Sequence, residues 1–78
     1  MDRPIGVDCR FEQNGQVQVR RMAVGDSWLV VEPGRQWIDE DGRHVLIMVP
    51  GGRVFEIVLS PETLTWKLVS SRTKTNIL

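Results

Sequence analysis

Hydrophobic and polar residues alternate in short runs along this chain, and turn residues separate the runs. Alternation with a period of two is typical of β-strands that bury one face. Pairs such as Asn14-Gly15 and Asp41-Gly42, which favour turns, lie between the runs. The pattern predicts strands at residues 5–11, 16–22, 27–32 with a broken continuation to 38, 43–49, 53–59 and 65–69.

The first predicted hairpin has two possible registers. A two-residue loop of Asn14 and Gly15 would pair Phe11 with Gln18 and place the apolar residues of the two strands on opposite faces. A three-residue loop that ends at Gly15 pairs Phe11 with Val17 and keeps the apolar residues together. It also places Gly15 where a bulged turn needs a positive φ. We favour the three-residue loop.

The hairpin of residues 43–59 is apolar on both faces. A two-residue turn of Gly51 and Gly52 would pair Val49 with Val54 and Ile47 with Glu56. One face would then hold Leu46, Met48, Phe55, Ile57 and Leu59, and the other Val45, Ile47, Val49, Val54 and Val58 around Glu56. Because an open sheet with a wet face would alternate apolar and polar residues, something must cover the second face. A closing barrel, a second sheet or another copy of the chain could do so.

Pro33 and Gly34 interrupt the third predicted strand, which is also apolar on both faces. They either bend the strand or form a type II turn that starts an extra short strand at residues 36–38. Strands that bend and are shared between two sheets form the corners of small barrels. The sequence therefore predicts an all-β fold, an antiparallel meander of six or seven strands rolled into a small barrel or a two-layer sheet.

Composition supports an all-β domain. The 78 residues include eleven valines, five isoleucines and one alanine, and β-branched side chains favour strands over helices. A chain of this length suits one small domain, which we place at residues 1–69. Residues 70–78 are polar and without pattern, and we expect them to form a mobile tail.

Several classes of protein are excluded by composition. The chain has no apolar run of the roughly 20 residues that a membrane helix needs, and its start lacks the apolar stretch of a signal peptide. The one cysteine, Cys9, cannot form an intramolecular disulfide and agrees with a reducing compartment. We therefore expect a cytoplasmic protein without membrane association.

The sequence offers no catalytic, metal or cofactor site. His44 has no partner at a recognisable spacing and is interpreted as a strand-end residue, and Cys9 as a small buried hydrophobe. The acidic turn at residues 39–42 lacks the ligand spacing of a calcium loop and is interpreted as a solvated hairpin turn. Gly51 and Gly52 lie in a hairpin and not before a helix, so they form no phosphate-binding loop. These observations predict a non-enzymatic domain with no small-molecule substrate.

The three tryptophans are the most informative aromatic residues. Trp66 alternates with Leu64 and Leu68 and is expected in the core. Exposed aromatic residues beside arginines could stack on bases and bind phosphates, although the net charge of zero lacks the basic excess of nucleic-acid-binding proteins. The candidate contacts for a partner or nucleic acid are Trp28, Arg35, Trp37, Arg43 and Arg53.

In chain order, several segments resemble one known family. They are Pro4-Ile5-Gly6-Val7, Asn14-Gly15 before a Val-x-Val strand, Trp28-Leu29-Val30-Val31 followed by Trp37, Asp41-Gly42-Arg43-His44, Gly52-Arg53-Val54-Phe55-Glu56-Ile57 and Leu64-Thr65-Trp66-Lys67-Leu68. Together they resemble small bacterial β domains of unknown function that occur free-standing or beside Y-family DNA polymerases. The resemblance covers most of residues 4–69 and implies the same fold. It also suggests an association with DNA repair or replication.

The functional expectation is an accessory or interaction domain without catalytic activity. The second apolar face of the hairpin of residues 43–59 would be covered by a partner, either another protein or a second copy in a homodimer. The alternative is a weak nucleic-acid-binding module that uses the five candidate residues.

Overall fold

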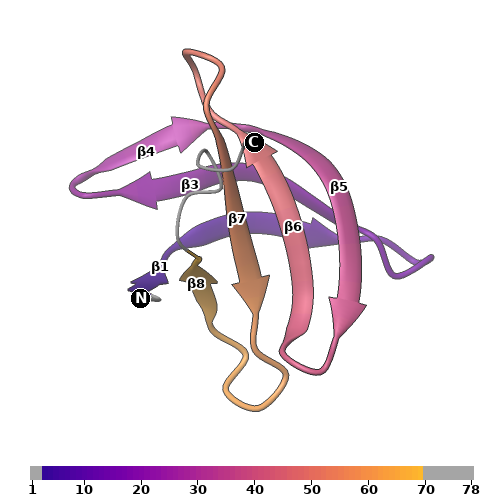
Figure 1. The fold of residues 1–78 in the computed structure, drawn as a ribbon. Coiled ribbons are helices and arrows are strands. Elements are labelled where there is room, and N and C mark those ends of the chain that lie inside the picture. Colours follow the sequence, from indigo (N-terminus) through magenta and orange to yellow (C-terminus); the bar gives the residue numbers. More distant parts are fainter. Residues whose placement is uncertain (1–2, 70–78) are drawn as a thin grey trace, which may run out of the picture.

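The computed structural model describes residues 3–69, which form eight strands in two antiparallel sheets (Figure 1). The predicted tail at residues 70–78 lies outside the described residues. One sheet has the strand order β1-β8-β7-β6-β5 and the other β2-β3-β4. The strands are β1 (Arg3–Ile5), β2 (Val7–Phe11), β3 (Val17–Val24), β4 (Ser27–Val30), β5 (Glu32–Asp39), β6 (Gly42–Met48), β7 (Val54–Leu59) and β8 (Trp66–Leu68).

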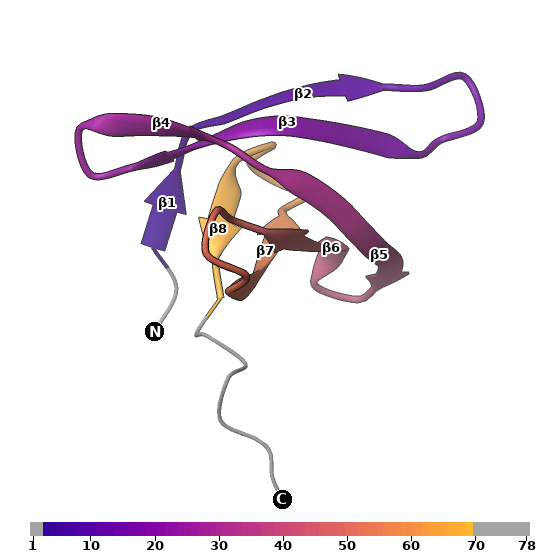
Figure 2. The same cartoon turned by 90° about the horizontal axis from the view of Figure 1, so that it is seen from above.

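The all-β, antiparallel prediction is confirmed, and the two sheets form layers that do not close into a barrel (Figure 2). Eight strands replace the expected six or seven, because two predicted strands cross from one layer to the other. The chain leaves the five-stranded sheet at Gly6, between β1 and β2, and returns to it at Val31, between β4 and β5. Within residues 3–69 there is no helix of the length and apolarity that a membrane span requires.

The first hairpin has the expected register. Phe11 pairs with Val17 and Cys9 with Val19, and the Glu12 N–H donates to the Gln16 carbonyl across the loop. Gly15 has a φ of 90°, a conformation that side chains other than glycine rarely adopt. The preference for a common apolar face therefore identified the correct loop.

The second hairpin differs from the prediction by one residue. Met48 pairs with Val54, and Leu46 pairs with Glu56. The Val49 N–H donates to the Arg53 carbonyl, so Pro50 joins the two glycines in a longer loop. A slip of one residue exchanges the faces of one strand relative to the other. As a result, the inner face of β7 holds Phe55, Ile57 and Leu59, and the outer face holds Val54, Glu56 and Val58.

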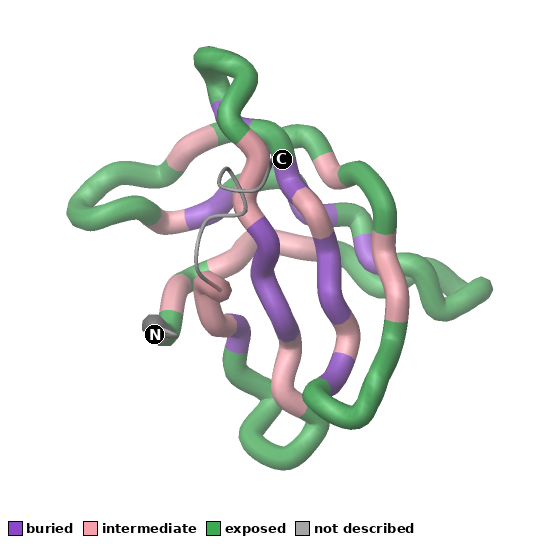
Figure 3. The backbone as a smooth tube through the Cα atoms, in the orientation of Figure 1, coloured by how far each residue is buried: buried purple, intermediate pink, exposed green. Residues whose placement is uncertain are grey.

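The hydrophobic core lies between the two layers, where β3 crosses the inner face of β6 and β7 (Figure 3). The tightly packed inner residues have at most 8% of their surface exposed. Trp66 belongs to this core, as its alternation predicted. The buried core residues are Val17, Val19, Met22, Val31, Val45, Ile47, Val49, Ile57 and Trp66.

Candidate functional site

The structure brings together two of the five candidate contacts, Arg35 and Trp37. Both lie on β5, where a bulge between Pro33 and Gln36 interrupts the pairing with β6. The Arg35 guanidinium carbon is 5.9 Å from the centroid of the Trp37 ring. Residues two apart on a strand share a face, so this cation–π contact follows from local geometry.

Trp28 lies in the other layer. It is 52% exposed on β4 and pairs with Ala23 on β3. The Arg21 guanidinium carbon is 5.9 Å from the centroid of its ring. Arg21 in turn donates to Asp8 over 2.8 Å. Trp28 and Trp37 therefore belong to different sheets and do not form a common stacking surface.

Arg43 and Arg53 lie at opposite ends of the β6–β7 hairpin. Arg43 donates to the Gln36 side chain over 3.1 Å. Gln36 also bridges the layers through the backbone N–H and carbonyl of Val17. The Arg53 guanidinium covers the ring of Phe55 at 5.3 Å. The five candidates thus do not converge on one nucleic-acid surface.

A polar cluster that the sequence did not reveal surrounds His44 on the outer face of β6. Its Nδ1 is 2.6 Å from Glu56 Oε2, and its Nε2 is 2.8 Å from Asp39 Oδ1. The Trp37 ring stacks on the imidazole with centroids 5.0 Å apart and planes 3° apart. His44 and Glu56 are 6% and 4% exposed. The cluster therefore joins β5, β6 and β7 across their outer face.

The two carboxylates favour the protonated imidazole. Each ring nitrogen needs a hydrogen to donate to its carboxylate, and only the imidazolium has both. Burial by itself would lower the pKa of His44, but the hydrogen bonds and charges of Asp39 and Glu56 outweigh it, so the pKa is raised. The pKa of Asp39 is lowered, first by the hydrogen bond from the Asp41 N–H and then by the one from His44.

In this geometry both nitrogens of the imidazole are engaged with carboxylates. While both nitrogens donate to carboxylates, the ring has no lone pair for a metal ion or for accepting a proton. The ligand atoms of Asp39, Asp41 and His44 all lie within 4.8 Å of one another. Asp39 Oδ1 already accepts from the Asp41 N–H and faces His44 Nε2, so hydrogen bonds explain this proximity.

Sequence reasoning missed the cluster because the assumed register paired Ile47 with Glu56. The observed pairing places Glu56 beside Leu46 and diagonal to His44 on the same face. One signal in the sequence could have revealed it: Glu56 is the single charged residue in the apolar run of β7. A buried carboxylate needs a partner, and His44 is the polar residue of the neighbouring strand that shares its outer face.

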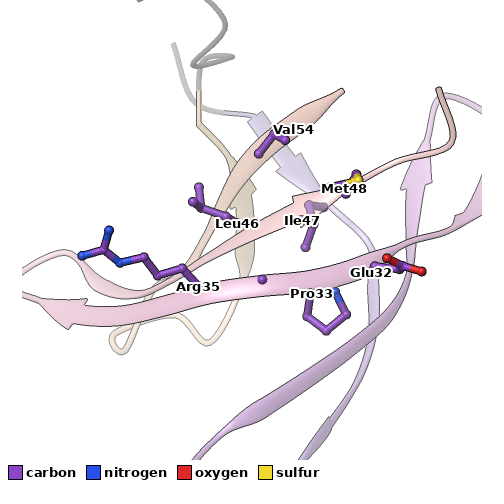
Figure 4. A pocket seen from close by; sticks show the side chains of 8 residues that line it. Glu32, Pro33, Arg35, Leu46, Ile47, Met48 and Val54 are labelled. Carbon is purple, nitrogen blue, oxygen red and sulfur yellow. The ribbon is translucent and has the colours of Figure 1, made fainter. Parts of the chain in front are cut away.

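An apolar groove lies further along the outer face, over β5, β6 and β7 (Figure 4). Its volume is about 230 Å³. Leu46, Met48 and Val54 supply much of its lining, and Glu32 and Arg35 lie on β5 beside them. Met48 is 47% exposed. The groove thus offers hydrophobic surface next to one acidic and one basic side chain.

Strand β5 forms an edge of the five-stranded sheet. Among residues 3–69 no strand pairs with the edge of β5 that points away from β6. An edge strand presents unpaired N–H and carbonyl groups that another chain can pair with. This edge lies alongside the groove and carries Arg35 and Trp37.

No family model, curated protein or solved structure matches this chain.

Proposed function

We propose that this chain is a non-enzymatic interaction domain that binds another protein along strand β5 and the adjoining groove. The observation that carries the proposal is that β5 combines an open backbone edge with an apolar groove directly beside it. Extended segments bind exposed sheet edges through main-chain hydrogen bonds, and side-chain pockets supply specificity. Both components are present in this region.

The His44 cluster supports this role by fixing the end of β5. Trp37 stacks on the imidazole, and Asp39 accepts a hydrogen bond from it. The imidazole is held from the other side by Glu56 on β7. A docking edge that is already ordered loses less conformational entropy on binding than a flexible one. We therefore assign the cluster to the organisation of the binding surface.

The groove can be tested by affinity capture from cell extract with matched variants. Met48→Glu places a charge at the groove, and Leu64→Glu places one at an exposed leucine in the loop before β8. We expect wild type and Leu64→Glu to capture the same partner proteins and Met48→Glu to capture none of them, provided that circular dichroism shows that Met48→Glu is folded. Equal capture of partners by wild type and both variants would contradict binding at the groove.

A second candidate function is weak binding of single-stranded nucleic acid, favoured by the contact between Arg35 and Trp37. An arginine beside an aromatic ring can bind phosphate while the ring stacks on a base. The family resemblance would place such binding in DNA repair or replication, and the single cysteine suits a cytoplasmic protein. Titration with oligonucleotides at low salt tests it: Arg35→Gln should weaken binding, whereas Arg20→Gln on β3 should not. Equal affinity for both variants would exclude this surface.

A further inference from the structure

We propose that a second copy of this chain binds to β5, antiparallel to it and related by a two-fold axis beside Trp37. This inference rests on the proposed function, because it names the partner of the same edge. The two five-stranded sheets would become one continuous sheet. Three features of the described residues carry the inference: the direction of the backbone groups, the charges along the edge and an uncovered phenylalanine.

The hydrogen-bonding pattern shows which backbone groups point outward. Val49 on the β6 side bonds to Arg53 on the β7 side. Because bonding directions alternate along a strand, His44 directs its N–H and carbonyl toward its partner Trp37 on β5. The same alternation directs the backbone groups of Gln36 and Ile38 to the open edge. An antiparallel partner centred on Trp37 would pair Gln36 with the partner's Ile38 through these groups.

In this register, charged side chains of one β5 strand lie opposite side chains of the opposite charge on the other copy. With Trp37 opposite the partner's Trp37, Arg35 lies opposite the partner's Asp39, and symmetry repeats the pair. Opposite charges on directly paired residues stabilise a sheet, and aromatic pairs do the same. The Asp39 side chain is 45% exposed and accessible to a partner. A self-complementary patch of this kind is what a two-fold interface requires.

The other layer also presents an uncovered apolar residue toward the added strand. Figure 2 shows the β2–β3 hairpin extending past β5 in the second layer. Phe11, at the end of β2, pairs with the fully buried Val17 and thus lies on the inward face of this hairpin. It is nevertheless 58% exposed. A strand added to β5 would lie over this part of the hairpin and cover the phenylalanine.

Sedimentation equilibrium with edge variants tests the proposal. Ile38→Pro removes an outward N–H without removing a bond to β6, since proline is tolerated where the N–H faces away from the ladder. Val30→Pro makes the same change at the open edge of β4, because Val31 bonds to Arg20 and its neighbour Val30 therefore points outward. We expect wild type and Val30→Pro to dimerise and Ile38→Pro to be monomeric.

A charge variant provides a second measurement if a proline variant fails to fold. Arg35→Glu would face the partner's Asp39 and should weaken dimerisation about tenfold. Arg20→Glu changes the net charge equally on β3 and should leave it unchanged. A wild type that stays monomeric at millimolar concentration, or a dimer insensitive to both β5 variants, would overturn the inference. A monomer that still captures proteins in a Met48-dependent way would leave the proposed function intact.

Discussion

The pairing of His44 with Glu56 makes a strong prediction, because both side chains are nearly inaccessible to water. Removing one partner of a buried ion pair typically destabilises a protein by about 3–5 kcal/mol, since the other charge stays buried. For Glu56→Leu we expect about 3 kcal/mol, the lower end of this range, because Asp39 still accepts from the second ring nitrogen. A chain of this length has a total stability of about 4–12 kcal/mol, so the variant should unfold much more easily.

A double-mutant cycle isolates the interaction from the loss of packing. His44→Leu, Glu56→Leu and the double variant are compared with wild type by urea unfolding near pH 6, with tryptophan fluorescence as the probe. The double variant should be more stable than the sum of the single losses by about 2 kcal/mol, because it buries no charge without its partner. The same cycle for His44 and Asp39 should give a smaller coupling, since Asp39 is 45% exposed. Additive losses for His44 and Glu56 would show that the two side chains do not stabilise each other.

Three further predictions concern pH, backbone geometry and the thiol. Because the pKa of His44 is raised, its stabilisation is complete below 6.5, the ordinary value, and is lost as pH rises through the folded pKa. The urea concentration at the unfolding midpoint should therefore fall as pH rises from 6.5 through the folded pKa of His44, and His44→Gln should abolish this fall. Gly42→Ala should destabilise by more than about 3 kcal/mol, because φ is 130° and the added carbon would meet the Leu59 carbonyl at 2.0 Å. Gly51→Ala, with φ of 99° and open space, should lose only about 1–2 kcal/mol, and a comparison of thermal midpoints checks this contrast. Burial raises the pKa of Cys9, so iodoacetamide should modify it more slowly in the folded than in the unfolded protein, and equal rates would contradict this.

The alternation of apolar residues was sufficient to predict the fold class and the first hairpin. There the correct register is the one that keeps Phe11 and Val17 on one face. Pro33 and Gly34 also marked a strand shared between layers, although the crossing itself occurs at Val31. The earlier crossing at Gly6 could not be predicted, because the apolar pattern continues through it without a turn signal.

The candidate site was predicted only in part, because the position of a strand in a sheet is not encoded locally. Arg35 and Trp37 lie together since they share a face of β5. Trp28 was grouped with them by chemistry, but β4 pairs with β3 in the other layer. The His44 cluster depends on a register that Pro50 shifts by one residue, and the two-residue turn that Gly51 and Gly52 suggested hid this shift.

The most direct test of docking at β5 is amide hydrogen exchange of the labelled wild-type protein at low and at millimolar concentration. The N–H groups of Gln36 and Ile38 point to the open edge of β5, and those of Trp28 and Val30 point to the open edge of β4. We predict that exchange at Gln36 and Ile38 slows as concentration rises, while exchange at Trp28 and Val30 stays fast. Equally fast exchange at all four amides at both concentrations would contradict the proposal that a second chain pairs with β5.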